Sequence, residues 1–345
     1  MSKLRIAIAG ATGYAGEELI RILRQHPSVQ ITALAASAKW DRPVPVGEVF
    51  PRFAGQLDLP VESLDSACLS RSCDVAFLAL PHGVSMTLAP TLLEHGVKVI
   101  DLAGDFRLKD PALFTRWYKL AHASPTVLGE AVYGLTELFG EQIRKARLIA
   151  NPGCYAASVI LACAPLLKAG VVERHGIIVD AKSGLTGAGR KTEASQMFAE
   201  MNENLWAYKV NQHQHAPEIE QALMASTGAG ALSMTMVPYV VPLNRGILST
   251  IYLRLAKPCV WEELDRLYRE FYRQAPFVRI RPKDQWPKVR EVEGTNYCDL
   301  AFAVDQEKKT IIVMAAIDNL MKGAAGQAVQ NLNVMAGWPE TTGLL

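Results

Sequence analysis

The stretch LRIAIAGATGYAGEELIRILRQHP, residues 4–27, constrains the fold more than any other part of the chain. A short β-rich run over 4–9 leads into a glycine-rich turn, and apolar residues at helical spacing then continue until a proline ends them. Gly10, Gly13 and Gly16 stand three residues apart. Glycines at such a turn let the backbone approach a diphosphate, and the helix start offers N–H groups. In this strand–turn–helix context the spacing predicts a dinucleotide-binding turn.

The end of the next predicted strand, 29–37, bears on which dinucleotide is bound. An NAD site usually has Asp or Glu there to hold the ribose 2′-hydroxyl. This chain has Ala-Ala-Ser-Ala-Lys over 35–39 and no carboxylate. The hydroxyl of Ser37 and the cation of Lys39 suit a 2′-phosphate, so the sequence favours NADP over NAD. The alternative for Lys39 is an ordinary solvated surface lysine.

Further strand-like and helical segments alternate along the first half of the chain. Strand-like runs cover 73–81, 97–103 and 146–153, and a helix is expected over 84–96. This alternation is typical of an α/β, Rossmann-like, doubly wound parallel sheet, whose ligands bind beyond the carboxyl ends of the strands. The opening turn then lies on the ligand side of that sheet.

The chain's 345 residues suggest about two domains. The middle region, 152–320, has several strand-like runs and a helix over 261–274. It reads as an α+β domain with a mixed or antiparallel sheet and helices on one face.

Composition excludes several classes of protein. The net charge is +2 with scattered basic residues, which does not indicate a nucleic-acid partner. No apolar run reaches the length of a membrane span, and the N-terminal run passes into the glycine turn as no signal peptide does. Six cysteines show neither C-x-x-C pairs nor zinc spacing, so we expect no metal site and reduced thiols in the cytoplasm.

One cysteine stands apart from the other five. Cys154 follows Asn-Pro-Gly at the end of a predicted strand and begins a predicted helix over 155–170, in which we expect Pro165 to bend or divide the helix. The N–H groups and dipole of a helix start depress a thiol pKa and can stabilise an oxyanion. Cys154 is therefore a candidate nucleophile, whereas Cys163 in the apolar helix body is interpreted as packing.

A nucleophilic cysteine usually needs a base, and the best candidates stand in NQHQHAPEIEQAL, 211–223. His213 and His215 precede a predicted helix in what we expect to be extended chain. Residues two apart in extended chain point the same way, so both can face one cleft. Spacing does not choose between them, and a pair of surface loop histidines is the alternative. His82 and His122 are weaker candidates.

Two further segments suit an anionic ligand. A glycine-rich stretch over 179–192 carries Lys182, Ser183, Arg190 and Lys191 among flexible backbone N–H groups. Arg245 sits between two strand-like runs, and its guanidinium can grip a carboxylate with two parallel hydrogen bonds. A mobile surface loop is the alternative for the first segment.

Eight blocks of sequence, in order, resemble the N-acetyl-γ-glutamyl-phosphate reductase family, which is related to aspartate-semialdehyde dehydrogenase. They are GATGYAGEELIRIL, ALPHGVS, DLAGDFRL, NPGCYA, DAKSGLTGAGR, HQHAPEIEQ, NRGIL and AAIDNLMKGAAGQAVQNLNVMAGWPETTGL. The resemblance covers essentially the whole chain. One departure is Ala157, where the family commonly has Thr.

The resemblance implies NADPH-dependent reduction of an acyl phosphate through a thioester on the cysteine, in arginine biosynthesis. It implies His213 as the acid–base residue, with His215 second. The other implied residues fall into two groups. The substrate group is Ser183, Gly184, Arg245 and His215, and the cofactor group is Gly10, Thr12, Gly13, Tyr14, Gly16, Ser37, Pro81 and Asn319.

The resemblance also bears on organisation. It implies a dinucleotide domain over 1–151 that is completed by the C-terminal segment 321–345, where a helix is expected over 318–338. Residues 152–320 then form the catalytic and oligomerisation domain. A homodimer or homotetramer is expected, with a small-molecule substrate and neither nucleic acid nor membrane as partner.

Two alternative functions stay open at this point. A relative in lysine biosynthesis reduces an aminoadipyl phosphate on a carrier protein, and one methylene in a pocket discriminates by only ~1–3 kcal/mol. The chain shows no evident basic groove for an acidic carrier. A non-catalytic NADP-binding sensor is the second alternative, although a sensor has no need of both Cys154 and His213.

Overall fold

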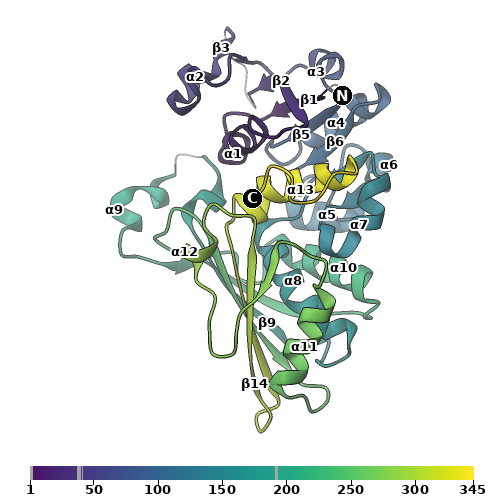
Figure 1. Ribbon diagram of the computed structural model, residues 1–345, viewed down its shortest axis with the longest axis vertical. Helices are drawn as coiled ribbons and strands as arrows, with labels where there is room; N and C mark the ends of the chain where they lie inside the picture. The colour runs from purple at the N-terminus through teal and green to yellow at the C-terminus, as the bar shows by residue number, and fades with distance from the viewer. Residues whose placement is uncertain (1–2, 37–39, 41, 191–192) are drawn as a thin grey trace. The chain divides into compact units, whose positions relative to one another are not determined.

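The computed structural model describes residues 3–36, 40, 42–190 and 193–345. They fall into two compact units: Met1–Pro152 with Ala324–Leu345, and Gly153–Gly323 (Figure 1). Ser37 and Lys39, the predicted contacts to a 2′-phosphate, and Lys191 of the glycine-rich stretch lie outside the described residues.

The first unit is built on an eight-stranded sheet in the order β3-β4-β2-β1-β5-β6-β8-β7. Every neighbouring pair from β2 to β7 along this order is parallel, which confirms the predicted doubly wound sheet. The strands are β1 Leu4–Ala9, β2 Val29–Ala35, β3 Val44–Pro45, β4 Pro60–Glu62, β5 Val75–Leu78, β6 Lys98–Asp101, β7 Val132–Tyr133 and β8 Leu148–Ala150.

Central strands of this sheet are apolar throughout because helices cover both faces of a parallel sheet. All four residues of β5 are buried. The helices of the unit are α1 Tyr14–Leu23, α2 Val46–Val49, α3 Ser66–Ser72, α4 Ser85–Glu94, α5 Pro111–Tyr118, α6 Pro125–Leu128, α7 Thr136–Lys145 and α13 Gly326–Met335, with a 3-10 turn η1 at Pro51–Phe53.

The expected helix over 318–338 is only partly α-helical. A π-helical turn, η4 Met321–Ala325, precedes α13. Side chains of α13 tie this helix to its unit: Gln327 Nε2 and Asn331 Nδ2 both donate to the carbonyl oxygen of Gly134, at 3.0 and 2.8 Å. Apolar periodicity cannot distinguish a π-turn from an α-turn, which is why the sequence missed it.

The second unit is built on a seven-stranded mixed sheet in the order β10-β11-β9-β12-β15-β14-β13. Its strands are β9 Ile177–Ser183, β10 Trp206–Ala207, β11 Met234–Val240, β12 Ile247–Arg254, β13 Val278–Ile280, β14 Cys298–Asp305 and β15 Thr310–Ile317. Its helices are α8 Cys154–Lys168, α9 Phe198–Met201, α10 His215–Thr227, α11 Trp261–Phe271 and α12 Val289–Val292, with 3-10 turns η2 Leu185–Ala188 and η3 Ala194–Gln196.

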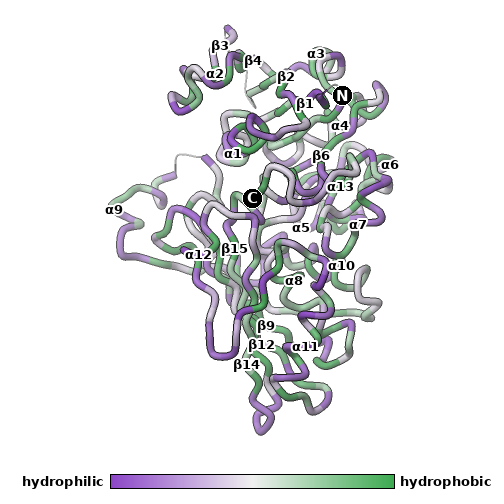
Figure 2. Tube along the Cα trace, viewed as in Figure 1, coloured by the Kyte–Doolittle hydropathy of each residue, from purple (hydrophilic) through white to green (hydrophobic). Residues whose placement is uncertain are grey.

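One face of this sheet is covered by helices of the same unit. Along β12 buried residues alternate with partly or fully exposed ones, as expected for a strand with one covered face. The helix α8 packs against β12 and β15 and also contacts α10 and α11. The hydropathy along these elements can be followed in Figure 2.

Pro165 does not divide α8, although division was one of the two outcomes expected from the sequence. The helix is continuous from Cys154 to Lys168. A proline in a helix leaves the carbonyl four residues earlier without its donor. Here that carbonyl, of Leu161, accepts the Tyr272 hydroxyl at 2.6 Å, and the Ala162 carbonyl accepts the hydroxyl of Tyr268 from α11. Tyr272 therefore replaces the lost bond, and Tyr268 binds the adjacent carbonyl.

Candidate functional site

The glycine turn of the first unit is shaped by close backbone packing. Gly10 has a left-handed φ of +83°, and a β-carbon there would overlap the carbonyl oxygen of Ala79. A β-carbon on Gly16 would overlap the carbonyl oxygen of Gly10. At Gly13, by contrast, the nearest atom to a β-carbon is the Gly10 oxygen at 3.5 Å. Gly10 and Gly16 are thus required by the fold, while a β-carbon on Gly13 would make only an ordinary van der Waals contact.

The helix α1 begins directly after this turn, with Gly13 as its N-cap residue. Within the described part of the chain no side chain caps this end by a hydrogen bond. Unsatisfied N–H groups at a helix start, together with the helix dipole, favour a bound phosphate. The turn and its open side at Gly13 therefore fit the diphosphate of a dinucleotide. Pro81, also predicted to line the cofactor, is exposed just beyond the carboxyl end of β5.

The carboxyl edge of the same sheet holds buried charged residues that sequence reasoning did not single out. Asp105 accepts the backbone N–H groups of Gly83 and Met86, at 2.9 and 3.0 Å. Burial and the neighbouring Asp105 carboxylate raise the pKa of Asp101, which is fully buried. Arg107 donates from Nε to the carbonyl oxygen of Asn151 at 2.8 Å. Their only sequence signal is the block DLAGDFRL.

In the second unit, Cys154 is the first residue of α8 and is partly exposed. The preceding Gly153 donates its N–H to Glu218 Oε1 at 2.8 Å. Across from the cysteine lies Gly323, where a β-carbon would come within 2.8 Å of Cys154 Cβ. Cys163, by contrast, is fully buried, and burial raises its pKa to about 12, in agreement with a packing role.

His215 and Glu218 lie against Gly153, the residue that precedes Cys154. His215 is the first residue of α10, and its imidazole rests on Gly153 so closely that a β-carbon there would overlap Nε2. The same Nε2 atom lies 4.0 Å from Glu218 Oε2. Glu218 is fully buried and His215 is 7% exposed. A carboxylate beside an imidazole is an arrangement that orients an acid–base residue.

His213 has a different role in this arrangement. Its Nδ1 accepts the backbone N–H of His215 at 3.1 Å. That bond commits the lone pair of the neutral ring, so the ring proton sits on Nε2 and His213 presents a donor. The two rings lie together, with centroids 4.5 Å apart. They share one site as the sequence predicted, although the sequence alone could not tell their roles apart.

The segment before α10 is a turn, where the sequence predicted extended chain. Lys209 and Asn211 have left-handed φ values of 44° and 54°. Asn211 docks this turn on β11, since its backbone N–H donates to the Met236 carbonyl and its Oδ1 accepts the Met236 N–H. Contacts with a distant strand decide this conformation.

Two tyrosines stand beside the histidines. Tyr155 packs edge-on against His213 with centroids 5.4 Å apart, and Tyr208 does so at 5.7 Å. The Tyr208 hydroxyl donates to the Tyr155 hydroxyl, which donates to the Tyr239 carbonyl. Burial raises the pKa of Tyr208 to about 12 and that of Tyr155 further still. Both phenols are therefore neutral donors. Neither tyrosine was predicted from the sequence to belong to the site.

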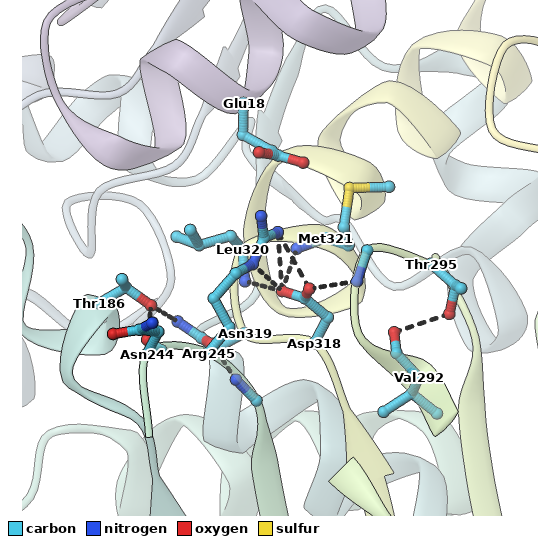
Figure 3. Close-up of polar contacts among 12 residues, drawn as sticks. Glu18, Thr186, Asn244, Arg245, Val292, Thr295, Asp318, Asn319, Leu320 and Met321 are labelled. Atoms are coloured by element: carbon cyan, nitrogen blue, oxygen red, sulfur yellow. Dashed lines mark hydrogen bonds and ion pairs between the residues drawn. The ribbon is translucent and has the colours of Figure 1, made fainter. Parts of the chain in front are cut away.

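Three of the four predicted substrate residues, Ser183, Gly184 and Arg245, meet where β9 ends and β12 begins. Ser183 is buried at the end of β9, and its hydroxyl donates to the Gly184 carbonyl. A β-carbon on Gly184 would lie 2.9 Å from the backbone nitrogen of Arg245, so glycine is needed there. Arg245 donates from Nε and Nη2 to Asp318 Oδ1, at 3.3 and 3.1 Å (Figure 3). Part of the guanidinium fork is thus occupied by a protein carboxylate.

Asn319, predicted to face the nicotinamide, uses its amide within the second unit. Its Oδ1 accepts the Gly246 N–H at 2.6 Å, and its Nδ2 donates to Thr186 Oγ1 at 3.0 Å (Figure 3). The side chain is 2% exposed. It joins the turn after β9 to the turn before β12, and its contact with a cofactor stays a prediction.

Two further properties concern only the described ranges. They contain no group of three or more His, Cys, Asp or Glu side chains placed to hold a metal ion. None of their helices is both long and apolar enough to cross a membrane.

The chain shares its fold with solved dehydrogenases. Aspartate semialdehyde dehydrogenase II from Vibrio cholerae, complexed with ASA, superimposes with a TM-score of 0.73 at 19% identity, over 98% of this chain and 99% of that one. Aspartate semialdehyde dehydrogenase with NADP from Candida albicans superimposes with a TM-score of 0.69 at 16% identity, over 97% and 99%. At such identities the likeness shows the fold alone.

Sequence comparison goes further. Residues 5–146 match the family described as semialdehyde dehydrogenase, NAD binding domain, and residues 154–319 match semialdehyde dehydrogenase, dimerisation domain. An N-acetyl-gamma-glutamyl-phosphate reductase from Symbiobacterium thermophilum is 47% identical over 99% of this chain and 97% of its own length. One from a Geobacillus species is 48% identical over 99% and 98%. The chain therefore belongs to the N-acetyl-gamma-glutamyl-phosphate reductase family.

Proposed function

We propose that this chain reduces N-acetyl-γ-glutamyl phosphate to N-acetylglutamate semialdehyde and phosphate, with NADPH as reductant, in arginine biosynthesis. The observation that carries the proposal is the placement of Cys154 at the start of α8, with the His215 imidazole resting on Gly153. The names of relatives with nearly half of their residues in common support the substrate.

Cys154 acts as the nucleophile. Its thiolate attacks the acyl carbon, a C–S bond forms, the C–O bond to phosphate breaks, and a thioester remains on the protein. Developing negative charge on the carbonyl oxygen is stabilised by the N–H groups of the first turn of α8. When bound, NADPH supplies the hydride that reduces this carbon to the aldehyde level. The Gly13 side of the turn before α1 suits its diphosphate.

His215 moves the proton of this reaction. It protonates the oxygen of the thiohemiacetal and takes the proton back as the C–S bond breaks, which releases the aldehyde and the thiolate. Glu218 stabilises the imidazolium, because its Oε2 lies 4.0 Å from His215 Nε2. This assignment differs from the sequence prediction of His213. The Nδ1 lone pair of His213 is committed to the backbone of α10, so we assign His213 a positioning role.

The remaining predicted residues complete the proposal. Ser183, Gly184 and Arg245 bind the substrate, with Arg245 supplying positive charge for a carboxylate. Gly10, Thr12, Gly13, Tyr14, Gly16, Ser37, Pro81 and Asn319 line the dinucleotide. Because the reaction needs a reduced Cys154, we place the enzyme in the cytoplasm, where thiols are kept reduced.

We also infer a homo-oligomer, most simply a homodimer formed through the second unit. The sheet face away from α8 carries apolar side chains, of which Ile178 is 44% and Tyr252 37% exposed. Leu248 and Met314 alternate with buried residues on neighbouring strands β12 and β15. The family description of this region as a dimerisation domain supports the same conclusion.

The reverse reaction tests the proposal directly. Phosphate-dependent reduction of NADP by N-acetylglutamate semialdehyde is measured with wild type, Cys154→Ser and the control Cys163→Ala. We expect activity in wild type and Cys163→Ala, and a loss of at least about 10³-fold in Cys154→Ser. Inactive wild type whose Cys154 is still alkylated would contradict the substrate. The carrier-bound aminoadipyl substrate would then be assayed.

A further inference from the structure

Asp318, which no sequence pattern singled out, accepts several hydrogen bonds through its carboxylate. It is fully buried and directly follows β15. Its Oδ1 accepts the backbone N–H groups of Leu320 and Met321, at 2.8 and 3.2 Å, in addition to the two bonds from Arg245 (Figure 3). Its Oδ2 accepts the N–H of Gly294 at 2.7 Å and lies 3.0 Å from Arg245 Nη2.

This carboxylate therefore joins two segments that are distant in sequence to the turn that directly follows it. The three segments are the turn carrying Arg245, the turn around Gly294 and the start of the π-helical turn at Met321. A buried carboxylate is costly unless a cation and hydrogen bonds compensate for its lost hydration, and here all of its bonds come from these three segments. Displacing one segment leaves the carboxylate undersatisfied, so the three positions are coupled.

The same chain segment leads to the nucleophile. The carbonyl oxygen of Asp318 accepts the N–H of Gly323 at 3.0 Å. Gly323 in turn packs against Cys154, within 2.8 Å of its Cβ if a β-carbon is added. Asp318 thus bonds through its side chain to Arg245 and through its backbone to the residue that lies against Cys154.

We propose that Asp318 is a positioning residue, which holds the Arg245 guanidinium at a fixed place relative to Cys154 so that a substrate carboxylate and the reacting carbonyl are bound at the correct separation. This inference rests on the proposed function, in which Arg245 binds the substrate. The specificity for the length of the substrate then depends on the ion pair between Arg245 and Asp318.

A second buried ion pair in the same unit offers a matched control. Asp299 on β14 is also fully buried and accepts Arg279 Nη2 at 3.0 Å. Arg279 lies on β13, the strand paired with β14. Breaking this pair removes a buried Arg–Asp contact of the same chemistry from a different part of the sheet.

The test compares Asp318→Asn, Asp299→Asn, Arg245→Ala and the double variant Asp318→Asn/Arg245→Ala in the full-length enzyme. KM and kcat are measured for the semialdehyde and for NADP, with thermal unfolding alongside. We expect Asp318→Asn to raise KM for the semialdehyde about tenfold, with KM for NADP within about twofold of wild type. In the Arg245→Ala background the same substitution should change KM less than about twofold.

Equal kinetic losses in Asp318→Asn and Asp299→Asn would overturn the proposal, as would an undiminished effect of Asp318→Asn in the double variant. If Asp318→Asn does not fold, Asp318→Glu keeps the negative charge but shifts the Arg245 guanidinium, and it should show the same KM-specific loss. The alkylation rate of Cys154 by iodoacetamide needs no substrate. A changed rate in Asp318→Asn but not in Asp299→Asn supports the positioning role even if wild type fails to turn over the semialdehyde, which would contradict only the proposed function. Unchanged rates in both variants would contradict the positioning role.

Discussion

Two helices of this protein begin directly after a strand and a glycine, and they differ in what surrounds their first turn. Around the start of α1 the neighbours are backbone atoms, since the glycines at 10 and 16 pack on carbonyl oxygens. Around the start of α8 the neighbours are side chains, since Gly153 packs under the His215 imidazole and donates to Glu218. The same local device offers N–H groups to a phosphate in one unit and supports a nucleophile in the other.

The largest effect is expected at the start of α8. Replacing His215 by Asn should lower kcat about 10³-fold, because the group that moves the proton is lost. His213→Asn should keep kcat within about tenfold of wild type. An Asn side chain can accept the N–H two residues later, and so replaces the bond from His215.

Turnover and thermal unfolding of both variants check this distinction. Equal losses of kcat would mean that the two histidines act as a unit. A larger loss of kcat in His213→Asn than in His215→Asn would assign the role of base to His213.

An intermediate effect is expected when a methyl group is added at each helix start. Gly10→Ala forces a left-handed φ and an overlap with the Ala79 carbonyl, so we expect unfolding free energy to fall by about 3 kcal/mol. In Gly153→Ala the added methyl group meets the tip of the His215 imidazole, which can rotate away. It should therefore keep most of its stability but lose about 10²-fold in kcat.

Urea unfolding together with reverse-reaction kinetics separates the two outcomes. Gly13→Ala is the control, because its β-carbon makes only an ordinary van der Waals contact; it should unfold like wild type and bind NADP more weakly. Wild-type stability in Gly10→Ala would mean that close backbone packing does not distinguish the start of α1 from the start of α8.

The smallest effect is expected at Asp101, which lies at the carboxyl end of β6 in the eight-stranded sheet. Its pKa is raised by burial and by Asp105, so folding favours the protonated form. This contribution is fully present below the unfolded pKa of about 4 and is lost as pH rises through the higher folded pKa. Asp101→Asn, a neutral isostere, should therefore gain stability relative to wild type by about 1–2 kcal/mol between about pH 4 and about pH 8.

Urea unfolding at both pH values measures this gain. Asp74 is the control of opposite sign, because its ion pair with Arg5 holds the pKa of that carboxyl below its usual range. Asp74→Asn should lose stability relative to wild type as pH rises to about 4, the unfolded pKa, and should change little between about pH 4 and about pH 8. A pH-independent difference between Asp101→Asn and wild type would mean that Asp101 is ionised in the folded protein.

Local patterns in the sequence predicted the elements that carry the site. The β-rich run before Gly10, the apolar spacing after it and the position of Cys154 after Asn-Pro-Gly depend on residues within one turn of each other. Periodicity and turn chemistry report such short-range preferences directly. The doubly wound sheet and the helix starting at Cys154 were therefore predicted correctly.

Long-range contacts decided the rest. His215 and Glu218 reach Gly153 from more than sixty residues away in the chain, and Asp318 reaches Arg245 across seventy-three. Tyr272 supplies the donor that keeps α8 continuous at Pro165, and Asn211 docks the turn before α10 on β11. No local pattern encodes these partners, because each depends on where two separately folded segments meet. The sequence by itself thus determined which residues begin the reactive helix, and only the tertiary structure decided which imidazole lies beside the nucleophile and which carboxylate holds Arg245.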